Sequence, residues 1–132
     1  MTTHILNFQP RFAELVASGA KRQTIRLLRK RPIAFGDTLR LYTGLRRPGA
    51  RLLAVGRVTS VQTIRLNWRK CLLDWKPQTK MLDTEFAQRT RIARLDGFSN
   101  WNEMIQWFER THGLPFNGVL IRWKLDAKRG EP

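Results

Sequence analysis

The stretch TLRLYTGLRRPGARLLAVGRVTSVQTIR, residues 38–65, decides the fold class of this chain. Its first six residues alternate apolar and polar side chains, which is the period of a strand with one buried face. A connection with two glycines and a proline follows, as is typical of a hairpin, and the segment from Arg51 to Arg65 is rich in residues that favour strands. We therefore expect antiparallel strands at the centre of the molecule, with a bulge or bend at Gly56.

The segments on either side of this stretch add further strands and helices. Phe12, Leu15 and Val16 share one helical face, and Gly19 stands where that helix should end. Asn100 resembles an N-terminal cap and precedes another amphipathic helix. The expected strands cover about 4–8, 24–28, 38–43, 51–65 and 118–125, and the expected helices about 10–18, 83–94 and 101–112.

The order of these elements indicates an α+β fold. Strands and helices do not alternate along the chain, so the βαβ units of a doubly wound parallel sheet are not expected. We predict a small, mostly antiparallel sheet or barrel decorated with two or three helices. With 132 residues the chain is expected to form one domain, with an irregular insertion at about 66–82 and a flexible tail at 126–132.

Composition argues against several classes of protein. A single cysteine, Cys71, cannot form an internal disulfide, and the distant His4 and His112 do not complete a zinc site with it. No apolar run approaches the roughly 18 residues of a membrane span, and the N-terminal residues lack the pattern of a secretory signal. We expect a cytoplasmic protein with no metal, no cofactor and no membrane among its partners.

Positive charge is the strongest signal in the sequence. The 25 lysines and arginines outnumber 10 acidic residues, for a net charge of +15. Residues 15–73 hold 14 basic side chains and one acid, a net of +13, whereas residues 74–132 have a net of only +2. Such asymmetry costs self-repulsion unless a polyanion neutralises it, and the 18 arginines favour bidentate contact with phosphate. We predict contact with nucleic acid; a membrane surface, an acidic protein and plain solubility are the weaker alternatives.

The segment GAKRQTIR, residues 19–26, is the strongest candidate site. Thr24 and Arg26 lie two apart on an expected strand and so point to the same face, with Lys21 in the preceding loop. Positive charge on Arg22 and Arg26 disfavours the charged form of Lys21, which suits a general base, and a hydroxyl beside such an amine is a potential nucleophile. From their chemistry alone, these residues favour phosphate contact over catalysis; a solvated loop before an edge strand is the third possibility.

Gly19, Lys21 and Arg26 reproduce the G-x-K-x-x-x-x-R signature of the ASCH domain family, which this chain resembles. Further elements that are similar to the family follow in the same order along the chain. They are Phe8-Gln9-Pro10-Arg11-Phe12, Phe35-Gly36-Asp37-Thr38-Leu39, Leu95-Asp96-Gly97-Phe98 and Leu114-Pro115-Phe116-Asn117-Gly118. The similarity covers about residues 4–125.

This resemblance implies a PUA-like β-barrel with a cleft beside the signature motif, and a role in binding RNA. One bacterial branch of the family removes the acetyl group from N4-acetylcytidine, with a lysine as base, a threonine three residues later as nucleophile and a downstream glutamate as proton donor. Lys21 and Thr24 match the first two positions. The third falls on Asp96, whose side chain is one methylene shorter than glutamate, and the segment between Arg65 and Asp96 is longer than in that branch.

Two functional hypotheses follow, with RNA or an RNA-derived nucleoside as the partner. The first is an RNA-binding module; its expected basic residues are Lys21, Arg22, Arg26, Arg29, Lys30, Arg46 and Arg47. Trp68, Arg69 and Lys70 mix an aromatic ring with positive charge, a composition that stacks bases and holds phosphates, although Trp68 could instead cover the barrel. The second is a hydrolase with Lys21, Thr24 and Asp96 as catalytic residues. A ribonuclease using the same cleft is a further variant.

Overall fold

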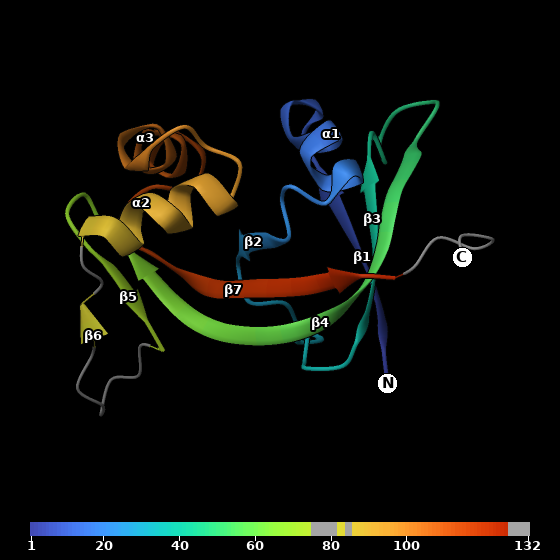
Figure 1. Cartoon of the computed structure of the whole chain (residues 1–132), viewed down its shortest axis with the longest axis horizontal. Coiled ribbons are helices and arrows are strands. Elements are labelled where there is room, and N and C mark those ends of the chain that lie inside the picture. Colours follow the sequence, from blue (N-terminus) through green and yellow to red (C-terminus); the bar gives the residue numbers. More distant parts are fainter. Residues whose placement is uncertain (75–81, 84–85, 127–132) are drawn as a thin grey trace.

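The computed structural model describes residues 1–74, 82–83 and 86–126, and for 82–83 and 86–88 it describes the backbone alone. Within these residues the chain forms one curled seven-stranded sheet and three helices, a mixed α+β fold (Figure 1). The strands are β1 (Thr3–Phe8), β2 (Gln23–Arg26), β3 (Thr38–Thr43), β4 (Arg51–Leu66), β5 (Cys71–Leu73), β6 (Leu82–Asp83) and β7 (Phe116–Leu125). The helices are α1 (Pro10–Ser18), α2 (Phe86–Leu95) and α3 (Trp101–His112).

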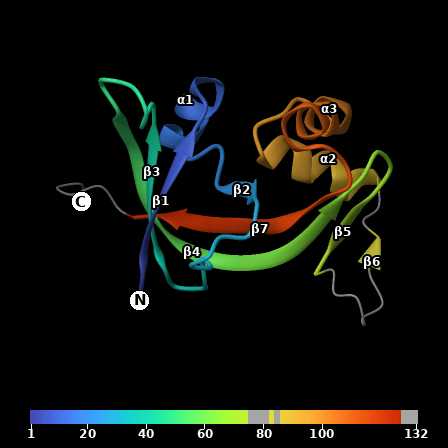
Figure 2. The same cartoon turned by 180° about the vertical axis from the view of Figure 1, so that it is seen from behind.

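The long strand β4 organises the sheet. β7 runs antiparallel to it from residue 56 to 66, and β2 pairs antiparallel with the other edge of β7. On its opposite edge β4 pairs first with β3, which carries β1 in parallel, and then at its far end with β5. Because β4 and β7 curl strongly, β1 and β2 face each other across an open seam instead of completing a barrel (Figures 1 and 2).

The core lies between the curled sheet and the helices, all three of which lie on one side of β4 and β7 (Figures 1 and 2). Met104, Ile105 and Phe108 of α3 are fully buried, as their helical spacing predicts, and so is Trp123 of β7. Leu120 is buried as well, so the middle of β7 has apolar side chains on both of its faces. The α3 end of the molecule is therefore fixed firmly against the strands.

Local sequence signals fix the ends of α1 and α3. Gly19 adopts a left-handed conformation (φ 83°) and its N–H donates to the Val16 carbonyl, ending α1 where the sequence predicts. Asn100 accepts the N–H of Glu103 through its side chain at 2.9 Å, which confirms the predicted cap of α3. The turn at Gly19 also directs the following residues under α1, because the Lys21 N–H donates to the Leu15 carbonyl at 2.9 Å.

The segment 66–82, expected to be irregular, contains regular structure. β5 pairs antiparallel with the end of β4, and β6 pairs with β5. The turn between β4 and β5 is held by Asn67, whose side-chain oxygen accepts the N–H groups of Arg69 and Lys70 at 2.9 and 2.7 Å. Residues 75–81, and 127–132 of the expected tail, lie outside the described residues.

Gly56 serves a different purpose from the bulge that the sequence predicts. The register of β4 shifts at Leu53, opposite β3, and at Thr59, opposite β7, on either side of Gly56. At Gly56 itself the strands come close together, because a Cβ atom there would lie 2.8 Å from the carbonyl oxygen of Lys124. The expected strand at 24–28 is also shorter: β2 ends at Arg26.

Candidate nucleic-acid interface

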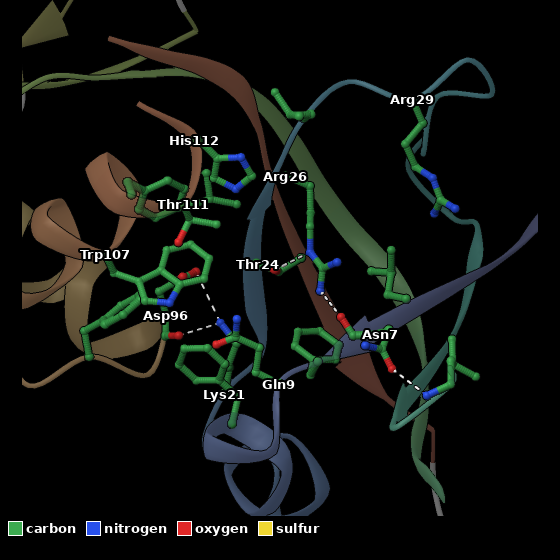
Figure 3. Close-up of a pocket in the computed structure, with 18 of the residues that line it drawn as sticks. Asn7, Gln9, Lys21, Thr24, Arg26, Arg29, Asp96, Trp107, Thr111 and His112 are labelled. Atoms are coloured by element: carbon green, nitrogen blue, oxygen red, sulfur yellow. Dashed lines mark hydrogen bonds and ion pairs between the residues drawn. The ribbon is translucent and has the colours of Figure 1, made fainter. Parts of the chain in front are cut away.

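A cleft of about 660 Å³ opens at the seam between β1 and β2, and we call it the β1–β2 cleft. α3 forms one wall, and α1 with the segment 96–98 forms the floor. Figure 3 shows Lys21, Thr24 and Arg26 pointing into it from the β2 side, opposite Trp107, Thr111 and His112 of α3. The cleft is thus built around the segment that the sequence marked as the strongest candidate site.

Lys21 lies at the bottom of this cleft and is 2% exposed. Its Nζ donates to the backbone carbonyl of Asp96 at 2.5 Å and lies 3.4 Å from Oδ1 of the same residue. Burial lowers the pKa of Lys21, the Asp96 carboxylate works against that shift, and the charge of Arg26 adds a smaller lowering effect. The sequence predicted a lowered pKa from neighbouring arginines; removal from water is the larger cause.

Asp96 directly follows α2 and joins that helix to the start of β2. Its Oδ1 accepts the Nε2–H of Gln23 at 3.2 Å, and Gln23 also donates to the Ile92 carbonyl at 3.1 Å. The Asp96 carboxylate therefore interacts with the ammonium of Lys21, in the loop after Gly19, and with the side-chain amide of Gln23, at the start of β2. The structure brings together Lys21 and Asp96, two of the three residues expected to be catalytic, and Thr24 lines the same cleft.

Arg26 and Arg29 bridge the open seam from the β2 side. Arg26 Nε donates to Thr24 Oγ1 at 3.0 Å, which confirms that the two side chains share a face. Its Nη2 donates to the backbone carbonyl of Asn7 in β1 at 2.7 Å, and Arg29 Nη1 reaches the Ile5 carbonyl at 3.4 Å. The Arg26 guanidinium also lies over the Phe8 ring, 4.8 Å from its centroid, and burial lowers its pKa.

Aromatic and polar residues of α3 complete the cleft, and sequence reasoning assigned them no role in it. Trp107 and Thr111 are one helical turn apart and lie off the apolar stripe, which is the signal that could have identified them. His112 packs against the Phe108 and Phe116 rings at centroid distances of 5.8 and 5.0 Å. Partial removal from water and the charge of Arg26 lower the pKa of His112.

The remaining predicted binding residues do not all gather here. Arg46, at the tip of the β3–β4 hairpin, lines the β1–β2 cleft, whereas Lys30 and Arg47 are exposed and are not among its lining residues. Arg22 lines a second cleft, beside α2. Trp68, Arg69 and Lys70 occupy the β4–β5 turn, away from both clefts; Trp68 is 54% exposed and its carbonyl accepts the Trp101 indole N–H at 3.5 Å.

The described part of the chain has neither a membrane-spanning helix nor a cluster of metal ligands. None of the helices there is long and apolar enough to cross a membrane. Among the same residues, no group of three or more His, Cys, Asp and Glu side chains comes together as a metal-ligand set. Comparison of the chain with family models, with curated proteins and with solved structures finds no match.

Proposed function

We propose that this protein binds single-stranded RNA in the β1–β2 cleft. The observation that carries the proposal is the combination of cations and aromatic rings in one cleft of nucleotide size. Four basic side chains line it: Lys21, Arg26, Arg29 and Arg46. Of the described residues that line it, Asp96 alone is acidic, and Lys21 and Gln23 already engage its carboxylate. The cleft is therefore suited to an anion that also has flat, apolar groups.

The arginines and the aromatic rings of this cleft would contact different parts of an RNA strand. Arg29 and Arg46 lie at the rim and are exposed, so they are available to phosphates. The rings of Trp107 and His112 line the cleft, where unstacked bases would find flat partners. The RNA has to be single-stranded at this point because bases inside a duplex present no free face. The cleft volume lies within the roughly 300–1,000 Å³ of small-ligand sites, enough for very few nucleotides.

We further propose that the curled sheet is a PUA-like barrel and that the chain is an ASCH domain. In support, the G-x-K-x-x-x-x-R residues Gly19, Lys21 and Arg26 have clear structural tasks: Gly19 ends α1, Lys21 reaches Asp96, and Arg26 bridges to β1. The Leu95–Phe98 element of the resemblance supplies both Asp96 and Phe98 to the same cleft.

RNA affinity should fall with salt, and Arg29 should contribute to that dependence. With about three phosphates contacted, the slope of log K against log salt should be about −2, so affinity falls roughly 20-fold between 50 and 200 mM salt. Arg29→Gln should reduce the magnitude of the slope by about 0.7. Fluorescence anisotropy with a labelled single-stranded oligonucleotide measures both. Arg31→Gln, an exposed neighbour outside the cleft, removes the same charge and is the control. Affinity that does not change with salt would exclude this binding mode.

A second candidate function, hydrolysis of an acylated nucleobase amide, is favoured by a buried Lys21 of lowered pKa that lines the same cleft as Thr24. Thr24 Oγ would attack the acyl carbon while Lys21 accepts the hydroxyl proton. Arg26, which already donates to Thr24 Oγ1, would stabilise the oxyanion. The proton that Lys21 takes from Thr24 would pass to the Asp96 carboxylate, 3.4 Å away, and from there to the leaving amine. Water would then cleave the Thr24 ester, releasing the acid and restoring the hydroxyl.

The hydrolase reading predicts acetate release from N4-acetylcytidine. Thr24→Ala should lower the rate by about 10³-fold or more, because it removes the nucleophile, while Thr24→Ser keeps a hydroxyl and should retain part of it. Thr111→Ala is the matched control, since this threonine lines the same cleft from α3. Acetate can be quantified by proton NMR. If the wild-type protein releases no acetate, this candidate function is excluded, and the proposal of RNA binding is unaffected.

A further inference from the structure

A second cleft, of about 500 Å³, lies on the other side of the contact between Gln23 and Asp96, and we call it the α2 cleft. It is walled by α2, by the start of β2 and by parts of β4, β5 and β7. Neighbouring residues of one short segment line different clefts. Lys21 and Thr24 line the β1–β2 cleft, whereas Arg22 and Gln23, which lie between them, line the α2 cleft. The two clefts therefore lie on either side of one short segment.

Three arginines from three different elements line the α2 cleft. Arg22 precedes β2, Arg91 lies on α2 and Arg122 lies on β7. Arg122 donates to the side-chain oxygen of Gln62 at 3.2 Å, and this partner is neutral. Of the described residues that line this cleft, none is acidic. Three guanidinium groups around one hollow repel each other, and an anionic ligand would relieve that cost.

Two buried polar groups in the wall of the α2 cleft also lack partners among the described residues. They are Oε1 of Gln23 and Nε1 of Trp123, whose residues are 2% and 3% exposed. The orientation of the Gln23 amide is fixed, because its Nε2 donates to both the Ile92 carbonyl and Asp96 Oδ1. Both residues line the α2 cleft and are absent from the lining of the β1–β2 cleft, and the Trp123 ring also packs towards Phe8, with the ring centroids 6.0 Å apart. An unused acceptor and an unused donor beside three cations suit a ligand with polar groups as well as negative charge.

We propose that the α2 cleft is a second RNA-binding site, which takes a phosphate and its attached nucleoside from the same strand that enters the β1–β2 cleft. This inference rests on the proposed RNA binding. A polynucleotide fits the observations better than an acidic peptide, since it brings charge together with base and ribose groups that both donate and accept hydrogen bonds. An RNA strand that crosses the segment 19–24 would contact both clefts, so the basic side chains of both could interact with its phosphates.

The indole N–H signals of Trp107 and Trp123 test this, because Trp107 is among the lining residues of the β1–β2 cleft and Trp123 among those of the α2 cleft. Trp107→Phe and Trp123→Phe assign the two signals among those of the five tryptophans. On titration with a single-stranded RNA of about twelve nucleotides, both signals should move. Arg91→Gln should suppress the Trp123 response and reduce the magnitude of the salt slope by about 0.7. Arg94→Gln, one turn further along α2 and outside both clefts, removes the same charge and should do neither.

The other outcomes separate this inference from the function on which it rests. Movement of Trp107 alone, or a Trp123 response that survives Arg91→Gln, would overturn the second site and leave RNA binding in the first cleft intact. Movement of neither signal would overturn the proposed function as well. A parallel titration uses an oligoglutamate peptide as probe. A Trp123 response to this peptide and not to RNA would assign the α2 cleft to an acidic protein segment and overturn the inference.

Discussion

Asp96→Asn is expected to lower the free energy of unfolding by about 3–5 kcal/mol, a fall of roughly 12–20 °C in Tm. The Lys21 ammonium and the Asp96 carboxylate are 2% and 7% exposed and lie 3.4 Å apart. Removing one charge leaves the other buried without its counter-charge, and that is the costly arrangement. Thermal and urea unfolding of the two proteins would measure the difference.

Two further variants distinguish the effect of breaking the buried Lys21–Asp96 pair from a general cost of substitution. Combining Lys21→Met with Asp96→Asn removes both charges, so the double variant should lose less stability than either single one. Glu14→Gln breaks an exposed pair with Arg51, whose atoms are 2.9 Å apart, and should cost less than about 1 kcal/mol because water screens it. Equal losses in Asp96→Asn and Glu14→Gln would contradict the importance of burial.

The pH dependence of stability gives a second measurement on the same pair. Burial lowers the pKa of Lys21 below its ordinary value of 10.5. Between the lowered value and 10.5, the unfolded chain holds a proton that folded Lys21 has released, so stability rises with pH through this window. Wild type should therefore gain stability relative to Lys21→Met as pH increases towards 10.5. A difference that stays constant would contradict the lowered pKa.

Gly118→Ala is expected to cost about 3 kcal/mol, or roughly 12 °C in Tm, because β7 has no room for a side chain at this position. A Cβ atom would collide with the backbone carbonyl oxygen of Arg26 and would lie 2.7 Å from Cε1 of Phe116. The Arg26 carbonyl is part of the β2 backbone, so relief requires β2 to move away from β7. Thermal unfolding would measure the loss.

Asn117→Ala is the control for this variant, because Asn117 is the exposed neighbour on the same strand and should change stability by at most about 0.5 kcal/mol. Since β2 carries Thr24 and Arg26, the Gly118 variant should also bind RNA more weakly than wild type. A Tm within about 2 °C of wild type would mean that β2 and β7 are less closely packed than the structure describes.

Periodicity and caps were enough to predict most of the elements from the sequence. The apolar spacing in α1 and α3 and the alternation in β3 and β7 are strong local signals, and Gly19 and Asn100 mark helix ends by their own chemistry. β5 was missed because three residues are too few to show a period. It forms because the side chain of Asn67 holds the preceding turn and the end of β4 offers a free edge.

The candidate site was also predictable from the sequence only in part. Thr24 and Arg26 could be placed together because β2 has a period of two. Arg22, two residues before Thr24, was expected in the same groove, but it precedes β2, where strand alternation does not apply, and it faces the α2 cleft. The position of Trp107 off the apolar stripe of α3 marks it as a residue outside the core, but its place in the β1–β2 cleft depends on how α3 is oriented towards β1, which only the packed structure defines.

The contacts of Arg26 and Arg29 across the seam have a consequence for the behaviour of the protein in solution. β1 pairs with β3 along one side, and its other side presents backbone groups that could accept a strand from a neighbouring molecule. The two guanidinium groups occupy the carbonyls of Ile5 and Asn7 and place positive charge along that edge. The same side chains thus protect the edge of β1 from pairing with another molecule. A substitution that removes them would expose an unpaired strand edge and favour aggregation.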